Sequence, residues 1–153
     1  MSVIDLLKEY GCFDSVCRIC DLIKIDFSAG SDVICLHTQS ALFRGLKFDD
    51  LLISSDDIFV PGKNYKKRFL RKFKWDIPGN TLFDDRLEIF TNEISNKKVK
   101  DVAIKGKDLL VDLEDGYRIE VLANTFTPDS EIYRIFKKDD LESHIVVETA
   151  DEE

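Results

Sequence analysis

Four cysteines in the first quarter of the chain could bind a metal. They are Cys12, Cys17, Cys20 and Cys35, and the first three follow a C-x4-C-x2-C spacing. That spacing is typical of the plant-type ligand set for a two-iron, two-sulfur cluster, and cysteine thiolates also bind zinc. The first chemistry to weigh is therefore electron transfer or metal binding.

The residues between these cysteines favour a different interpretation. They are bulky, which fits a protein core better than a loop wrapped around a cluster. On a regular strand Cys17 and Cys20 would face opposite sides, whereas cluster ligands must converge. Cys35 lies within the apolar run VICL, where a free cysteine packs as a small hydrophobic residue. We expect the cysteines to be core residues and expect no cofactor; an iron–sulfur or zinc protein is the alternative.

Acid–base and nucleotide chemistry have little support in the sequence. The two histidines, His37 and His144, lie in the predicted strand segments LHTQS and SHIVV, without an H-E-x-x-H or nucleophile-elbow context. The sequence contains neither G-x-G-x-x-G nor a Walker loop. We interpret both histidines as structural and expect the protein not to be an enzyme.

Doubled aspartates are the remaining candidates for chemistry. The four pairs are Asp49-Asp50, Asp56-Asp57, Asp84-Asp85 and Asp139-Asp140. Neighbouring residues on a strand diverge, and no calcium-binding loop motif is present. They are interpreted as solvated faces or helix caps, although an acidic surface can also attract a basic partner.

Composition indicates a single globular domain over residues 1–148 with an acidic, disordered tail at 149–153. The 153 residues carry a net charge of −8, which argues against binding of nucleic acid or an anionic membrane by the whole surface. The N-terminus lacks the pattern of a signal peptide, and no apolar run approaches the length of a membrane span. We therefore expect a cytoplasmic protein with reduced cysteines.

One basic segment departs from this acidic composition. Residues 63–74 hold seven of the 22 basic residues and no acid, so the rest of the chain holds 15 basic and 30 acidic residues. Tyr65, Phe69 and Phe73 recur there at helical spacing, which favours burial of the aromatic side chains while the lysines reach solvent. A contact surface for nucleic acid or for a partner is the alternative.

Two helices are predicted. Residues 2–10 have near-helical apolar spacing and end at Gly11. Residues 81–96 begin with a capping box of Thr81 and Asp84. Apolar residues then repeat at helical spacing, which predicts packing on a sheet; they are Phe83, Leu87, Phe90 and Ile94.

The remaining segments read mainly as strands, beginning at Val16. In the last third, a three-residue loop at 114–116 with Gly116 in the left-handed region would pair Leu113 with Tyr117 and Val111 with Ile119. A weak internal repeat relates residues 21–44 to residues 108–134. The predicted fold class is α+β, with a mainly antiparallel sheet in two β-meander halves, a short N-terminal helix and a longer central helix packed on the sheet.

Several stretches together carry a family resemblance. They are LHTQSALFRG (36–45), SSDDIFVP (54–61), FKWDIPGNTLFDDRLEIF (73–90), and DLLVDLEDGYRIEVLAN with YRIFKKDDLESHIVVE (108–148). They resemble small bacterial immunity proteins of contact-dependent growth inhibition and other polymorphic toxin systems. The matching positions mark a turn, a helix start and two strands; they are Arg44, Trp75, Asp76, Gly79, Asn80 and Arg134.

The resemblance implies a non-enzymatic protein that binds a cognate toxin domain in a 1:1 complex and occludes its active site. Many such toxins are nucleases with basic substrate grooves, which an acidic protein can occupy. We predict that acidic residues make the contact; they are Asp56, Asp57, Asp139, Asp140 and Glu142. A stand-alone protein-interaction module is the alternative.

Overall fold

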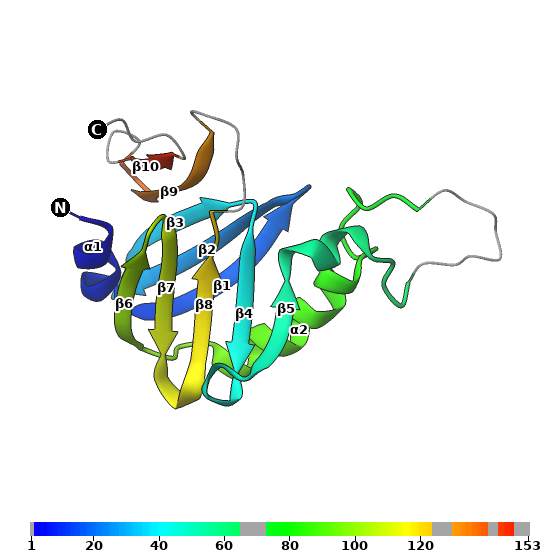
Figure 1. The fold of residues 1–153 in the computed structure, drawn as a ribbon, viewed down its shortest axis with the longest axis horizontal. Helices are drawn as coiled ribbons and strands as arrows, with labels where there is room; N and C mark the ends of the chain where they lie inside the picture. Colours follow the sequence, from blue (N-terminus) through cyan, green and yellow to red (C-terminus); the bar gives the residue numbers. More distant parts are fainter. Residues whose placement is uncertain (1, 65–72, 124–129, 141–143, 149–153) are drawn as a thin grey trace.

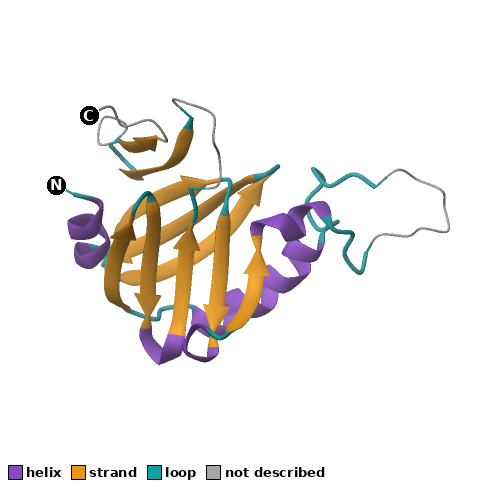
Figure 2. Cartoon of the chain, in the orientation of Figure 1, coloured by secondary structure: helices purple, strands orange, loops and turns teal. Residues whose placement is uncertain are grey.

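The computed structural model describes residues 2–64, 73–123, 130–140 and 144–148. The predicted aromatic stripe of the basic segment, apart from Phe73, and the predicted acidic tail lie outside the described residues. Two antiparallel sheets and two α-helices form the α+β fold that the sequence predicts (Figures 1 and 2). No helix in the described part of the chain is long and apolar enough to cross a membrane.

The elements follow one another in a simple order. The strands are β1 (Cys12–Ile19), β2 (Leu22–Ala29), β3 (Asp32–Thr38), β4 (Ala41–Gly45), β5 (Asp50–Ser54), β6 (Val99–Lys105), β7 (Asp108–Leu113), β8 (Tyr117–Val121), β9 (Glu131–Lys137) and β10 (Ile145–Glu148). The α-helices are α1 (Val3–Glu9) and α2 (Leu82–Ile94), and short 3-10 helices are η1 (Leu46–Phe48), η2 (Ser55–Phe59) and η4 (Glu114–Gly116).

The first half of the chain (β1 to β5) and the second half (β6 to β10) each contribute strands to both sheets. The first sheet has the order β1-β2-β3-β9-β10 and the second has the order β5-β4-β8-β7-β6. Each sheet is therefore a three-strand meander from one half joined by a hairpin from the other half. The predicted meanders are present as β1 to β3 and as β6 to β8, but the fourth and fifth strands of each half cross to the opposite sheet. In Figure 1 the strands of the second sheet stand in front, and β1 to β3 cross behind them.

The hydrophobic core lies between the two sheets because the strands bury alternate side chains. Ile23, Ile25 and Phe27 on β2 are fully buried, as are Leu109 and Val111 on β7. These residues belong to one continuous cluster that also includes buried side chains of both α-helices. The second sheet thus has one face in the core and the other free to carry polar side chains.

Helix α2 begins and packs as the sequence predicts. The Thr81 hydroxyl accepts a hydrogen bond from the Asp84 backbone N–H, and the Asp84 side chain accepts from the Thr81 backbone N–H. This capping box satisfies N–H groups that the helix itself cannot. The helix contacts β1 and β5, the edge strands of the two sheets, and so covers one open side of the sandwich.

Phe90 joins the sheets from α2. Its ring lies edge-on to Phe13 on β1, with ring centroids 6.1 Å apart, and to Phe43 on β4, with centroids 4.9 Å apart. Helix α1 has a capping box of Ser2 and Asp5 and packs near β6. The two helices therefore fix the positions of the sheet edges and of the turns between strands.

The predicted register of the β7–β8 hairpin is confirmed. Leu113 pairs with Tyr117 and Val111 pairs with Ile119. Gly116 has φ +83°, in the left-handed region that favours glycine. Two boundaries differ from the prediction. Strand β1 begins at Cys12 because it continues the backbone pairing of residues 96–99. The stretch 51–60, which the sequence predicts as a strand with an acidic break, is the end of β5 followed by η2, because Ser54 caps that 3-10 helix in a capping box with Asp57.

Candidate functional site

The turn between β4 and β5 has an unusual backbone. Leu46, Lys47 and Phe48 are consecutive non-glycine residues with φ of +48°, +56° and +82°. Each L-residue in the left-handed region costs about 1–2 kcal/mol, and such conformations persist only where the surrounding structure holds them. Strain of this kind concentrates at functional sites. The Leu46 side chain is 74% exposed at this turn, so an apolar group is held out to solvent at an energetic cost.

Two contacts hold the strained turn in place. A Cβ atom on Gly116 would lie 2.9 Å from the Lys47 backbone nitrogen, so the β7–β8 hairpin approaches this turn as closely as glycine allows. The guanidinium carbon of Arg118 lies 3.7 Å from the centroid of the Phe48 ring, a cation–π contact. The turn is therefore fixed against β8 at both its backbone and its aromatic side chain.

Arg118 also connects this turn to a charged network on the outer face of the second sheet. Its Nε and Nη2 donate to the two carboxylate oxygens of Asp112, at 2.5 and 3.1 Å. The hydrogen bond to Asp112 raises the pKa of Arg118 above its usual value. On the next strand, Arg44 donates to Glu120 at 3.0 Å. Paired charges of this kind fix the side chains before any partner arrives.

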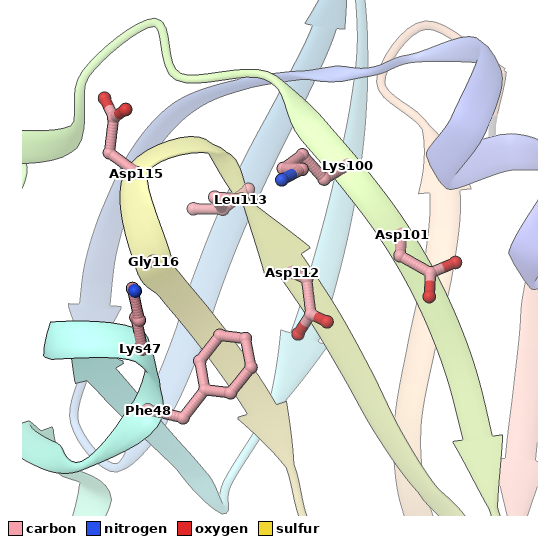
Figure 3. A pocket seen from close by; sticks show the side chains of 8 residues that line it. All are labelled: Lys47, Phe48, Lys100, Asp101, Asp112, Leu113, Asp115 and Gly116. Carbon is pink, nitrogen blue, oxygen red and sulfur yellow. The ribbon is translucent and has the colours of Figure 1, made fainter.

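A pocket lies beside the turn. Side chains from the β4–β5 turn, the β7–β8 hairpin and β6 surround it (Figure 3). The lining residues are Lys47, Phe48, Lys100, Asp101, Asp112, Leu113, Asp115 and Gly116. The lining thus combines carboxylates and amino groups with the Phe48 ring, and the exposed Leu46 precedes two of the lining residues in the same turn. Such a mixed surface with apolar anchors is typical of protein–protein contact.

The predicted acidic residues of η2 are only partly available to a partner. Asp56 is exposed. The Asp57 carboxylate accepts a hydrogen bond from the Ser54 backbone N–H at 3.0 Å and another from Arg86 at 3.0 Å. Its side chain is mostly buried. Asp57 therefore caps η2 and joins it to α2, whereas Asp56 can face a partner.

The other predicted acids lie elsewhere. Asp139 and Asp140 follow β9 and are exposed, and Glu142 lies outside the described residues. η2 packs against α2, on the side of the sandwich where β1 and β5 form the sheet edges. The β9–β10 connection belongs to the opposite edge of the first sheet. The structure therefore does not bring Asp56 and Asp139 into one surface.

The expectation that all four cysteines are core residues is wrong for two of them. Cys35 is buried, but Cys17 and Cys20 are exposed. Cys17 lies on the solvent side of an edge strand, and Cys20 ends the strand in a tight turn at φ +55°. Within the described residues, no group of three or more histidine, cysteine, aspartate or glutamate side chains could hold a metal ion.

Cys35 has the properties of a structural thiol. Burial raises its pKa to about 11, and the hydrogen bond with Asp26 acts in the same direction. The thiolate is the nucleophilic form, so a raised pKa makes Cys35 unreactive at neutral pH. Its neighbourhood on the outer face of the first sheet is therefore a poor candidate for covalent chemistry.

The two histidines lie on either side of one aromatic ring. The Phe136 ring stacks on His144, with centroids 4.2 Å apart, and meets His37 edge-on, with centroids 4.9 Å apart. Arg134 lies 3.1 Å from Nδ1 of His144. The ring atom Nε2 of His37 is buried, with no partner in the described residues. The hydrogen-bonding structural role predicted for both histidines is therefore seen for His144, whereas His37 packs on Phe136 and leaves Nε2 without a partner in the described residues.

The positions on which the family resemblance rests lie in the turn before α2 and on strands β4 and β9. Gly79 has φ +87°, and its N–H donates to Asp84 at 2.9 Å. Asn80 donates from its side chain to the Lys74 carbonyl oxygen. Trp75 packs against Phe59, with ring centroids 5.0 Å apart. Gly79, Asn80 and Trp75 therefore stabilise the conformation of this turn.

Sequence reasoning missed the strained turn and its partners. LKF contains none of the glycine, asparagine or aspartate residues that usually mark left-handed turns. No local signal marks this turn, because the residues that hold it, Gly116 and Arg118, lie far from it in the sequence. Comparison of the chain with protein-family models, curated proteins and solved structures found no match.

Proposed function

We propose that this chain is a non-enzymatic immunity protein that acts in the bacterial cytoplasm. It binds a cognate toxin domain 1:1 and occludes that toxin's active site, and a nuclease is the toxin class that we favour. The dispersed motifs from residue 36 to residue 148 support the family assignment. The net charge of −8 supports attraction to a basic substrate groove.

One structural observation carries the proposal of a binding role. Leu46 stands exposed on three consecutive left-handed residues, and Gly116 and Arg118 hold that turn rigid. An apolar anchor that is already ordered loses little conformational entropy when it binds, so its burial contributes more fully to affinity. We assign the β4–β5 turn and its pocket as the toxin contact.

The carboxylates around the turn suit a basic partner. Asp101 is exposed at the pocket, and Asp115 is exposed although it pairs with Lys97 at 2.5 Å. Asp112 is held by Arg118. The exposed carboxylates around the turn are Asp49, Asp50, Asp101 and Asp115, and they outnumber the exposed lysines of the pocket, Lys47 and Lys100. Such groups steer a basic toxin surface toward Leu46 and set the salt dependence of association.

The test of function is co-expression with the toxin-like domain encoded immediately upstream. We expect growth to be restored and the purified pair to bind tightly with 1:1 stoichiometry by calorimetry. A pair that neither binds nor restores growth would contradict the immunity role for that partner.

A pair of matched truncations tests the contact surface separately. Leu46→Ala should weaken toxin binding by at least about tenfold, or about 1.4 kcal/mol. Ile104→Ala removes an exposed apolar side chain from β6, the edge strand of the same sheet that lies opposite the β4–β5 hairpin, and it should change affinity less than about twofold. Equal effects of the two variants would overturn this contact surface and leave the inhibitory function standing.

A further inference from the structure

Titratable side chains form a cluster on the outer face of the first sheet. Alternate residues of β2 are buried in the core, so Lys24 and Asp26 point outward. The strand register places two rows of side chains on that face, across β2, β3 and β9. One row is Lys24, His37 and Arg134, and the next is Asp26, Cys35 and Phe136. Strand β10 continues the sheet beyond β9, and the pocket of the toxin contact includes none of these side chains.

Strand β10 is the edge of the first sheet. It has four residues, it pairs with β9, and its register shifts between Val147 and Glu148. Val146 is 38% exposed. Short strands at a sheet edge belong to the parts of a protein that open at low cost in free energy. Side-chain contacts at the start of β10 therefore matter for how firmly the strand is held.

His144 makes those contacts at the residue before β10. Its ring stacks on Phe136, with ring centroids 4.2 Å apart, and Nδ1 lies 3.1 Å from Nη1 of Arg134. Both of these partners belong to β9. Phe136 is 9% exposed although it points away from the core, with His144 on one side of the ring and His37 on the other. The imidazole thus fastens the start of β10 to β9.

The contact with Arg134 fixes the protonation state of His144. Arginine has only hydrogen-bond donors, so Nδ1 of the imidazole must accept, and the ring is neutral with its proton on Nε2. Arg134 is not free to turn away, because its Nε and Nη2 donate to the two carboxylate oxygens of Glu131 at 3.2 and 2.6 Å. A proton added to Nδ1 would therefore bring two donors and two positive charges face to face.

The other charged and titratable groups of this face come from three strands. They are Lys24 and Asp26 on β2, Cys35 and His37 on β3, and Glu131 on β9, with Lys138 just after β9. The two carboxylates already have partners, because Glu131 binds Arg134 and Asp26 binds the Cys35 thiol. A proton on His144 would therefore meet the charge of Arg134 first.

We propose that His144 is a pH-sensitive latch that holds β10 on the first sheet. At neutral pH the imidazole accepts from Arg134 and stacks on Phe136, and β10 stays paired with β9. When the imidazole takes up a proton, Arg134 repels it, the ring leaves Phe136 and β10 detaches. Histidine is the side chain whose charge changes between about pH 5 and pH 8, so mild acidification operates the latch.

The latch is independent of the proposed toxin contact. Strand β10 belongs to the first sheet, whereas Leu46 and the pocket belong to the turns and strands of the second sheet. Detachment of β10 would uncover the Phe136 ring and leave β9 as a new sheet edge. An uncovered ring beside an unpaired strand is a surface to which another chain can bind.

Hydrogen exchange of the full chain tests the latch. Protection of the backbone amides at 145–148 is measured at about pH 7.5 and about pH 5.5, relative to unfolded-chain rates at the same pH. We expect this protection to fall at least about tenfold on acidification. Amides of β7 should stay more protected than those of β10 at both pH values, which shows that β10 opens without unfolding of the core. NMR titration of the two imidazoles should show that the fall follows protonation of His144.

Three variants identify the groups responsible. His144→Asn places an amide oxygen near the position of Nδ1, where it can accept from Arg134 without titrating, so β10 protection should no longer depend on pH. Arg134→Gln removes the cation and leaves a group that can accept from a protonated imidazole, so the acid effect should disappear. His37→Gln removes the histidine on the other side of Phe136 and is the matched control, which should keep the acid effect.

Two results would overturn the proposal. One is a wild-type chain whose β10 amides have equal protection at both pH values, or none at about pH 7.5. The other is an acid effect of wild-type size that persists in His144→Asn or in Arg134→Gln. Loss of the acid effect in His37→Gln alone would assign the pH dependence to His37 and remove the role of His144.

Discussion

The guanidinium of Arg18 binds the carboxylate of Asp84 through two hydrogen bonds of 2.7 Å, across 66 residues of sequence. The Arg18 side chain is 4% exposed and that of Asp84 is 16% exposed. Burial acts to raise the pKa of Asp84, but the hydrogen bonds from Arg18 and Thr81 outweigh it, and the pKa is lowered overall. One carboxylate thus caps α2 and fixes the β1–β2 turn.

Asp84→Ala should destabilise the fold by about 3–5 kcal/mol, because it leaves the buried Arg18 guanidinium without its charged partner. Urea unfolding followed by circular dichroism measures the loss. Glu88→Ala, an exposed change on the same helix, is the control and should stay within about 0.5 kcal/mol. Equal midpoints for the two variants would show that the ion pair does not hold this end of the molecule.

The stability should also depend on pH through His37. Burial and the charge of Lys24 lower the pKa of His37 below its usual value. Its folded-state pKa is therefore below the unfolded value of about 6.5, and the unfolded chain binds more protons in the interval between them. The stabilisation is complete above about pH 6.5 and is lost as pH falls through the folded-state pKa.

His37→Gln should flatten this part of the pH profile. Urea unfolding of the wild type and the variant at about pH 7.5 and about pH 5 gives the difference. The wild type should lose more stability between the two values than His37→Gln does. A variant that keeps the full wild-type slope would assign the pH dependence to other groups.

Alanine substitutions at two glycines with similar backbone conformations can distinguish the energetic cost of backbone strain from the cost of close packing at the β4–β5 turn. Gly106 and Gly116 both have positive φ, but a Cβ on Gly106 meets no atom within 4 Å. Gly106→Ala should cost about 1–2 kcal/mol of stability, from the left-handed backbone alone. Gly116→Ala should cost at least about 1 kcal/mol more, because its Cβ would overlap the Lys47 backbone.

Thermal or urea unfolding of the two alanine variants measures that difference. Toxin binding gives a second readout, since displacement of the turn should weaken binding in Gly116→Ala and leave it unchanged in Gly106→Ala. If the two substitutions cost the same, the hairpin does not hold the strained turn.

Thiol labelling should distinguish the exposed from the buried cysteines. Cys17 and Cys20 are exposed and should react quickly in the native protein. Cys35 should react only when the chain unfolds, since it is buried and its pKa is raised to about 11. Mass spectrometry after brief alkylation, with and without denaturant, identifies the labelled residues. Rapid native labelling of Cys35 would contradict its placement.

The acidic residues predicted from sequence can be tested one surface at a time. If the acidic loops contact the toxin, Asp56→Lys should slow association and weaken its salt dependence. Asp139→Lys makes the same charge change on the opposite edge of the sandwich. Stopped-flow association at low and high salt compares them. Because the two loops lie apart, a slowing in both would require two toxin contacts or a long-range field.

Short-range features of this fold could be read from the sequence. Thr81 and Asp84 predicted the start of α2, and the loop ending at Gly116 predicted the register of its hairpin. In each case the residues that interact lie within a few positions of one another, so the local sequence pattern is sufficient to predict their contact.

The tertiary structure decided what depends on distant segments. Strand β9 pairs with β3, and β4 pairs with β8, although the sequence suggested two separate meanders. Arg18 binds Asp84, and Cys17 faces solvent because the β1–β2 register places it opposite Lys24, on the outer face of the first sheet. Each of these outcomes depends on which strands meet. Many pairings satisfy the same local alternation, so only the packing of the whole core selects among them.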